Sequence, residues 1–227
     1  MSEIAENLAG GVAGHTAAQP PRDRSRRRRA SRDPAGRTQI LDAAVACILE
    51  LGFYRASTNE IARRANVSWG AIQYYFGSRE SLMIAAVEEL NRRFIASIAQ
   101  RHVEGETLEE RVEALYELLA QYYSAPAYLA RMQIMLNLQS DPDTSAEASA
   151  ALADMSTQVA DQIRRLLTEA LGPDADPARN SALFHAIRGF AVSRQLAESI
   201  DPEHGRHDDE VRRIFLASIV ATERRSH

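Results

Sequence analysis

The sequence contains no lysine, one cysteine, one tryptophan and no long uninterrupted apolar run. The single cysteine, Cys47, excludes a disulfide framework, a cysteine-rich zinc site and a CxxC redox motif. Cys47 lies within an apolar helical stretch, residues 40–51, so we expect a small buried side chain rather than a reactive thiol. Because no apolar run approaches the roughly 20 residues that cross a bilayer and no signal-peptide pattern opens the chain, we expect a cytoplasmic protein with no membrane partner.

The motifs of common enzyme classes are also missing. There is no glycine-rich phosphate loop, no Gly-x-Ser-x-Gly elbow and no His-Glu-x-x-His metal helix. Residues 204–209 (His-Gly-Arg-His-Asp-Asp) have a possible interpretation as a metal cluster, but no predicted helix or strand fixes these ligands. An acidic loop between two helices explains them equally well. The sequence therefore predicts no enzyme, no cofactor and no metal site.

Charge is unevenly distributed along the chain. The net charge of −4 divides into +4 over residues 1–37, zero over residues 38–85 and −8 over the rest. A basic N-terminal segment followed by an acidic remainder indicates two roles within one chain. All 27 basic residues are arginine, which we attribute chiefly to genomic base composition, although guanidinium groups suit phosphate contacts.

Apolar residues follow a helical period from about residue 37 onward, and no period-2 run predicts a strand. The sequence therefore predicts an all-α protein with three short helices in an N-terminal domain, residues 34–82, and longer helices in a second domain, residues 83–227. Residues 1–33 contain paired glycines, paired prolines and four consecutive arginines, which predict a disordered arm. About nine helices are expected, near residues 34–51, 58–64, 69–76, 79–102, 108–124, 127–139, 144–171, 176–200 and 208–225.

Five positions have the chemistry of a helix end. Gly52 and Asn66 adopt left-handed conformations at low cost. The hydroxyl groups of Ser57, Ser68 and Thr144 are placed to accept hydrogen bonds from the first turn of the helices that follow. Ser57 and Thr144 are each followed three residues later by glutamate, which is the spacing of a capping box.

Residues 57–82 have the pattern of a helix-turn-helix. Apolar residues on two short helices close a small core across a turn of three or four residues: Ile61, Ala62, Ala65, Val67, Ile72 and Phe76. The second helix leaves a mixed polar and aromatic set near its other face, available to a major groove: Ser68, Trp69, Gly70, Gln73 and Tyr74. A plain helical hairpin with solvated polar residues would show the same pattern.

The motif Thr58-x-x-Ile-Ala-x-x-Ala-x-Val-Ser68-x-Gly-x-Ile-x-x-Tyr75-Phe-x-Ser-Arg79-x-x-Leu82 resembles the DNA-binding domain of the TetR family of transcriptional regulators. The resemblance covers about residues 37–85 at fixed spacing without gaps, and it includes the preceding Leu51-Gly-Phe. Beyond residue 100 it rests only on the number and length of helices.

The resemblance implies DNA contacts at nine positions, which include Arg37 and Tyr74. Thr58 and Tyr75 would contact phosphate, and Arg79, in place of the family's usual lysine, would serve the same anion. The start of the recognition helix, formed by Ser68, Trp69 and Gly70, would approach bases and sugar. Gln73 would read adenine through a bidentate contact.

Three departures from the family pattern mean that the operator sequence is not transferable from another member. Trp69 stands where lysine is frequent, Gln73 where tyrosine is frequent and Asn66 where glycine is frequent. Trp69 could stack on a sugar or touch a thymine methyl group.

The arginine run in residues 22–32 has two interpretations. It is either a solvated tail or an arm that follows the phosphate backbone or enters a minor groove. Its position directly before the first helix favours the arm.

The second domain is expected to bind a mainly apolar small molecule, because aromatic and methionine residues there follow helical spacings. The same spacings are typical of core, and a histidine on such a helix is more often a core residue than a ligand contact. The candidate ligand-binding residues are Tyr122, Met132, Met135 and His185.

Two apolar stripes on the last two helices indicate a homodimer that pairs through a four-helix bundle, although each stripe could also face the subunit's own core. The candidate interface residues are Leu183, Ile187, Phe190, Val211, Ile214, Phe215 and Ile219. The resemblance implies a dimeric regulator, a repressor by family analogy, that binds a near-palindromic double-stranded operator and is released by a ligand. The alternative is a dimeric helical interaction protein without specific DNA binding.

Overall fold

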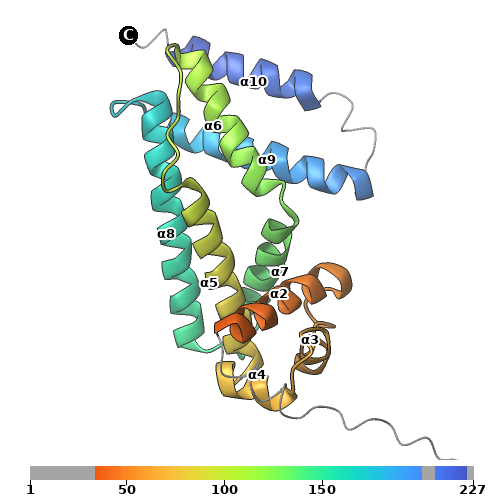
Figure 1. The fold of residues 1–227 in the computed structure, drawn as a ribbon. Coiled ribbons are helices and arrows are strands. Elements are labelled where there is room, and N and C mark those ends of the chain that lie inside the picture. Colours follow the sequence, from red (N-terminus) through yellow and green to blue (C-terminus); the bar gives the residue numbers. More distant parts are fainter. Residues whose placement is uncertain (1–33, 201–207, 224–227) are drawn as a thin grey trace, which may run out of the picture.

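The computed structural model describes residues 34–200 and 208–223, and this part of the chain forms nine helices and no strand (Figure 1). The all-α prediction is confirmed. The arginine-rich arm, residues 1–33, and the histidines of the possible metal cluster, His204 and His207, lie outside the described residues. The helices are α2 (Pro34–Leu51), α3 (Thr58–Arg64), α4 (Trp69–Phe76), α5 (Arg79–Ile98), α6 (Leu108–Tyr123), α7 (Pro126–Ser140), α8 (Ala146–Leu171), α9 (Pro177–Ile200) and α10 (Asp208–Glu223).

Local chemistry sets the ends of the first helices as expected. Gly52 and Asn66 have φ values of 81° and 48°, and each follows a helix that ends one or two residues earlier. The Ser57 hydroxyl accepts a hydrogen bond from the Glu60 backbone N–H at 3.2 Å. The Ser68 hydroxyl accepts one from the N–H of Ala71 at the same distance. These caps begin α3 and α4 at the predicted residues.

The start of α8 differs from the prediction. Ser145, and not Thr144, is the N-cap residue, and its hydroxyl accepts a hydrogen bond from the Ala148 backbone N–H. The physical reason is a long-range contact. The Glu80 carboxylate on α5 accepts hydrogen bonds from the Ser145 N–H at 3.1 Å and from its hydroxyl at 2.8 Å. This contact joins the first turn of α5 to the first turn of α8.

The core has two clusters of buried apolar side chains. The first joins α2, α3, α4 and the front of α5 to α7 and the first half of α8. The second joins the end of α5 to α6, the start of α7, the second half of α8, α9 and α10. Helix α7 therefore contributes to both clusters, and it also packs against α2 of the N-terminal three-helix unit, which crosses it in Figure 1.

Cys47 lies in the first cluster with no exposed surface, as predicted. Burial raises the pKa of its thiol, with smaller opposing and reinforcing effects from the charges of Arg64 and Glu60. The thiol therefore stays protonated and shielded at neutral pH.

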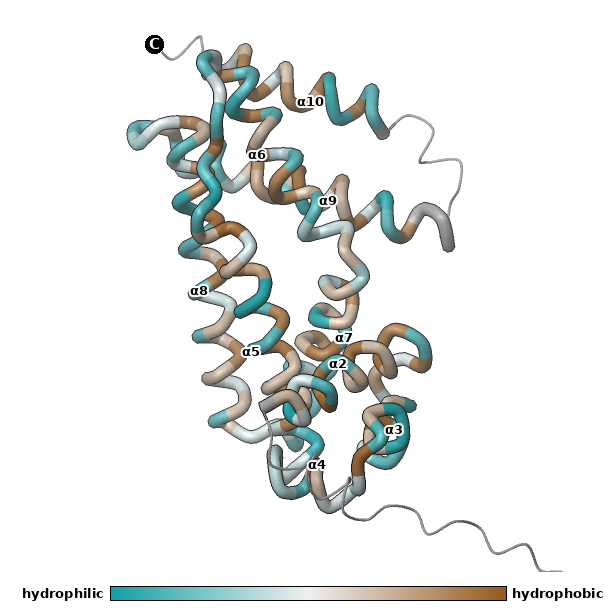
Figure 2. Tube along the Cα trace, in the orientation of Figure 1, coloured by the Kyte–Doolittle hydropathy of each residue, from teal (hydrophilic) through white to brown (hydrophobic). Residues whose placement is uncertain are grey.

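Helices α5 and α8 run side by side along the molecule, with α2, α3 and α4 at one end and α6, α9 and α10 at the other (Figure 1). Figure 2 shows apolar residues interspersed with polar ones along every long helix. In the described ranges, no helix combines the length and apolar character that a membrane span requires. The arrangement places the helix-turn-helix at one extremity.

Candidate nucleic-acid interface and ligand region

Helices α3 and α4 form the predicted helix-turn-helix. Residues 65–68 join them, and the left-handed Asn66 makes the turn. The six apolar side chains predicted to close its core are all buried: Ile61, Ala62, Ala65, Val67, Ile72 and Phe76. Because α4 buries this face, its other face is directed away from the core.

The outer face of α4 brings together the predicted recognition residues. Trp69 and Tyr74 are 55% and 72% exposed, which is unusual for large aromatic side chains in a folded domain. Ser68, Gly70 and Gln73 are exposed beside them. The surface therefore offers rings, a hydroxyl group and an amide.

Two of the predicted DNA-contact residues make contacts with other residues of the protein. The Gln73 side-chain amide donates a hydrogen bond to the Gly77 carbonyl oxygen at 2.5 Å. The ring of Tyr75 is half-buried and lies edge-on to Tyr74, with the ring centres 5.4 Å apart. Gln73 must give up its bond to Gly77 in order to read a base.

Arg79 is half-buried and is held by contacts within the protein. Its guanidinium group lies 4.3 Å from the ring centre of Phe53 and donates a hydrogen bond of 2.5 Å to the Phe53 carbonyl oxygen. Burial lowers the pKa of Arg79, and the charge of Asp141 opposes this effect. The side chain holds the α2–α3 connection against the start of α5.

Arg37 also makes contacts within the protein. Its guanidinium carbon lies 5.6 Å from the ring centre of Phe76, and one of its nitrogens lies 3.8 Å from a Glu88 oxygen. Thr58 is half-buried in the first turn of α3.

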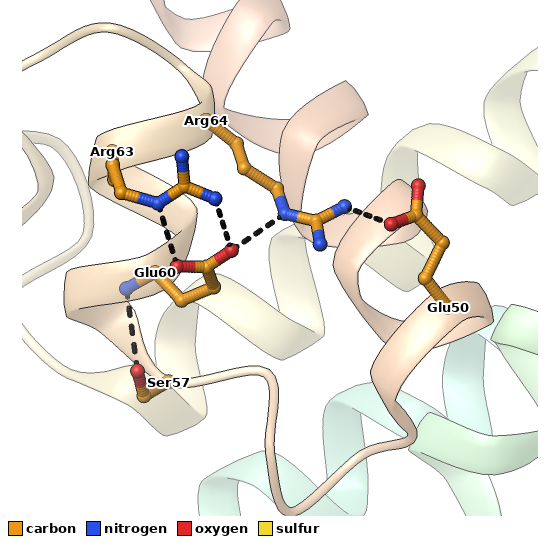
Figure 3. A network of polar contacts seen from close by, with 5 residues as sticks. All are labelled: Glu50, Ser57, Glu60, Arg63 and Arg64. Atoms are coloured by element: carbon orange, nitrogen blue, oxygen red, sulfur yellow. Dashed lines mark hydrogen bonds and ion pairs between the residues drawn. The ribbon is translucent and has the colours of Figure 1, made fainter.

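Glu60 and Glu50 together pair with the two arginines of α3 (Figure 3). Arg63 donates hydrogen bonds to both Glu60 carboxylate oxygens, at 2.8 and 2.6 Å. Arg64 bridges Glu60 and Glu50 at 2.8 and 2.5 Å. The hydrogen bonds from Arg63, and then those from Arg64, lower the pKa of Glu60 to about 2. The predicted reciprocal capping box is therefore only half formed, since the Glu60 carboxylate binds arginines.

Two exposed residues of this region were not identified from the sequence. Tyr54, in the α2–α3 connection, is 81% exposed, and its neighbour Arg55 is also exposed. Arg55 makes no ion pair within the described residues, in contrast to Arg63 and Arg64. The sequence does place an aromatic residue next to a basic one between two predicted helices, and this pattern could have indicated a DNA contact.

Comparison with known proteins identifies this surface. The family model described as "Bacterial regulatory proteins, tetR family" matches residues 40–86, which span the helix-turn-helix. The chain belongs to the TetR family. The family consists of regulators of transcription and not of enzymes, in agreement with the enzyme motifs missing from the sequence.

Curated relatives of this TetR family member share parts of its sequence. The chain is 32% identical over 134 residues to the HTH-type transcriptional repressor Rv1474c of Mycobacterium tuberculosis, covering 58% of this chain and 66% of the relative. It is 34% identical over 74 residues to the fatty acid metabolism regulator protein of Bacillus subtilis, covering 33% and 38%. The alignments thus span about one third to two thirds of these relatives.

Solved structures share the fold. A transcriptional regulator from Rhodococcus sp. Rha1 superposes with a TM-score of 0.59 at 22% identity, covering 84% of this chain and 96% of that one. The multidrug binding protein EbrR complexed with ethidium superposes with a TM-score of 0.57 at 23% identity, covering 82% and 99%.

The four candidate ligand-binding residues are divided between the two clusters and the surface. Tyr122 and Met132 pack against the second cluster, whereas Met135 is buried in the first. His185 is exposed, with its Nδ1 3.2 Å from an Arg188 nitrogen, so the alternative of a core histidine is wrong. A groove of about 760 Å³ is lined by α6, by residues that follow α5 and by Arg194 of α9, and none of the four candidates lines it.

The candidate dimer residues separate into two groups. Leu183 and Ile187 have no exposed surface in the single chain and pack in its own second cluster, so they are corrected from interface to core residues. Their stripe faces α6, which contacts α9 extensively. Of the other five, Val211 and Ile214 are exposed, Phe190 and Phe215 are half-buried, and Ile219 is buried.

Proposed function

We propose that this chain is a dimeric, cytoplasmic regulator of transcription that binds a near-palindromic DNA operator and represses until a small molecule releases it. The observation that carries the proposal is the outer face of α4. A short helix that exposes Trp69, Gln73 and Tyr74, on a scaffold whose inner face is fully packed, has the size and chemistry to enter a major groove.

The roles of the site residues follow from their positions. Gln73, Trp69 and Tyr74 approach base edges, and Ser68 and Gly70 allow the first turn of α4 to lie close to the sugar-phosphate backbone. Thr58, Tyr75 and Arg37 contact phosphates. Arg79 acts through Phe53, because its guanidinium group fixes the loop that carries the exposed Tyr54 and Arg55.

The charge of the domain supports a DNA-binding role for the arm. Residues 34–82 contain five arginines and four acidic residues, and four of those arginines contact groups of the protein itself. A surface with so little uncommitted positive charge makes few phosphate contacts. We therefore assign much of the electrostatic attraction to the seven arginines of residues 1–33.

Two long helices offer a route from the second domain to α4. Helix α5 begins at Arg79, directly behind α4, and Glu80 in its first turn is bonded to Ser145 at the start of α8. A ligand that favours another arrangement of α5 and α8 therefore changes the separation of the two recognition helices in a dimer. Release follows from the ligand's differential affinity for the two arrangements.

The proposal is tested by selecting fragments of the source genome that bind the purified chain, followed by electrophoretic assays against bulk DNA. We expect salt-sensitive binding to a sequence with two related half-sites about 34 Å apart. Tyr75→Phe should weaken binding to all sequences, and Gln73→Ala should relax preference at one position in each half-site. Equal affinity for every fragment would instead support the alternative of a helical interaction protein.

A further inference from the structure

A buried guanidinium group lies in the second domain, apart from the DNA-binding surface. Arg131 of α7 is only 9% exposed. Its Nε donates a hydrogen bond of 2.7 Å to the Asn91 side-chain oxygen on α5. The Asn91 amide in turn donates to the Met155 carbonyl oxygen on α8, at 3.4 Å. The chain of contacts places one positive charge where α5, α7 and α8 meet.

No carboxylate of the described residues lies within 4.0 Å of this guanidinium group. Helix α7 contains no acidic residue. On α5, Glu89 is bound by Arg92 and Arg93. On α8, the exposed Asp154 accepts a hydrogen bond from Gln158, and Asp161 pairs with Arg164. A buried charge without a counter-charge is unfavourable, and proteins that keep one usually pair it.

A second polar group in the same region also has no partner. The Tyr122 hydroxyl is buried and makes no hydrogen bond in the structure. Burial raises the pKa of Tyr122 to about 12, and the charge of Arg131 acts against this rise. The hydroxyl therefore remains a hydrogen-bond donor near a positive charge at every physiological pH.

Aromatic rings surround these polar groups. The Tyr122 ring stacks on Phe94 with ring centres 3.5 Å apart, and Tyr128 lies edge-on to it at 5.3 Å. Tyr123 contacts Tyr128 at 4.8 Å and Phe184 at 6.1 Å. Flat apolar surfaces beside a cation and a hydroxyl donor are the elements of a site for an amphipathic acid.

We propose that Arg131 is the anion-binding centre of the effector site and that the effector is a small organic acid with an apolar body. The carboxylate pairs with the Nη atoms of Arg131 and accepts a hydrogen bond from Tyr122, and the apolar body lies among the rings of Phe94, Tyr122 and Tyr128. This inference rests on the proposed ligand-responsive function. It replaces the expectation of a mainly apolar ligand, because the sequence pattern did not show that Arg131 is buried.

The position of the site connects it to α5. Asn91 lies twelve residues beyond Arg79 on the same helix, about 18 Å along its axis. In this proposal a carboxylate on the Nη atoms of Arg131 shifts the guanidinium group whose Nε is bonded to Asn91, and the apolar body of the ligand separates the stacked rings of Phe94 and Tyr122. Both changes act on α5, the helix that begins directly behind α4.

The test measures binding to the full chain without DNA, by calorimetry and thermal shift. The probes are 1-naphthoate and decanoate, each compared with its uncharged amide, 1-naphthamide or decanamide. We expect a carboxylate to bind and raise the melting temperature, and its amide to bind at least about tenfold more weakly. Arg131→Gln should weaken binding of the carboxylate probes about 10- to 100-fold. Tyr122→Phe should weaken their binding by a smaller factor. Equal binding of acids and amides, or no binding by either acid, would overturn the proposal.

Stability distinguishes a binding role of Arg131 from a structural one. The double variant Asn91→Leu/Arg131→Met removes both buried polar groups, so the ligand-free protein should melt no lower than wild type. Arg165→Met is the matched control, because Arg165 bonds to Glu169 and to the carbonyl oxygens of Ile98 and Arg101. That variant should lower the melting temperature and leave carboxylate binding unchanged. A lower melting temperature in the double variant would assign Arg131 to the fold and contradict the proposal.

The DNA experiment keeps the two proposals separate. Carboxylate binding that depends on Arg131 but does not release DNA would support this site and contradict ligand-controlled repression. Specific operator binding without binding of any probe acid would support the proposed function and contradict this site.

Discussion

The guanidinium group of Arg79 lies over the ring of Phe53, with its carbon 4.3 Å from the ring centre, and donates a hydrogen bond to the Phe53 carbonyl oxygen. The two residues are 26 positions apart in the sequence. Their contact ties the α2–α3 connection to the first residue of α5. Arg79 therefore stabilises the shape of the DNA-binding domain as well as adding to its positive electrostatic potential.

The first prediction is that Arg79→Ala lowers both stability and DNA affinity. Removing the guanidinium group from the ring and from the carbonyl oxygen should reduce the free energy of unfolding by about 1–3 kcal/mol. Arg55→Ala is the matched control, because Arg55 is exposed and should change stability by less than about 0.5 kcal/mol while weakening DNA binding. Urea unfolding and a binding titration measure the two effects. Equal stability of wild type and Arg79→Ala would show that the contact between Arg79 and Phe53 adds nothing to the free energy of unfolding.

The second prediction concerns the stability of the protein at acidic pH. Because the pKa of Glu60 is lowered to about 2 in the folded chain from an ordinary value of 4.5, its contribution to stability is complete above pH 4.5. That contribution is lost as the pH falls from about 4.5 towards 2. Glu60→Gln should therefore flatten the pH dependence of the melting temperature in this range. A variant with the same acid dependence as wild type would show that the arginine contacts do not stabilise the carboxylate.

The third prediction uses Cys47 as a reporter of the DNA-binding domain. The thiol has no exposed surface and its pKa is raised by burial, so reagents reach it only when the domain opens. Modification by a chromogenic disulfide at pH 8 should be at least about a hundredfold slower than in the urea-unfolded chain. Similar rates in the two states would contradict the buried position of Cys47.

The fourth prediction separates the two interpretations of the arginine-rich arm. Deletion of residues 1–33 should make the dependence of log affinity on log salt concentration shallower by about 0.9 for each phosphate that the arm neutralises. Replacing the arginines at positions 26–29 with glutamine gives a full-length control that removes charge without removing chain. An unchanged salt slope in both proteins would identify the arm as a solvated tail.

Features set by neighbouring residues were predictable from the sequence. The positive φ of Asn66 and the hydroxyl caps at Ser57 and Ser68 depend on groups within three positions, and all three are in the structure. The buried face of α4 follows from a helical period over eight residues. These local rules were sufficient to place the helix-turn-helix and its outer face.

Features set by distant residues were not predictable. Ser145 replaces Thr144 as the N-cap because Glu80, 65 positions earlier, binds Ser145. Arg79 turns inward because Phe53 lies beside it after folding. The burial of Arg131 depends on packing between α5, α7 and α8, and a single arginine in an amphipathic helix gives no sign of it. Side chains of this kind need the tertiary structure.

The fifth prediction concerns the dimer, for which we now use four of the residues first expected together with one that the sequence did not indicate, Leu196. Val211 and Ile214 on α10 are 45% and 59% exposed, and Leu196 on α9 is 39% exposed. The rings of Phe190 and Phe215 lie 5.8 Å apart between the two helices. Apolar side chains gathered on adjacent helices favour a twofold interface that removes them from water.

Ile214→Glu and Ile187→Glu should therefore behave differently. Ile214→Glu places a charge on the exposed side of α10, so the chain should stay folded but sediment as a monomer and lose operator affinity, because one half-site provides too few contacts. Ile187→Glu buries a carboxylate in the subunit's own core and should unfold the second domain. Sedimentation velocity and circular dichroism at micromolar concentration distinguish these results. If Ile214→Glu sediments as a dimer, this face of α10 is not the interface. If the wild type is a monomer that still protects two half-sites, the dimer itself is contradicted.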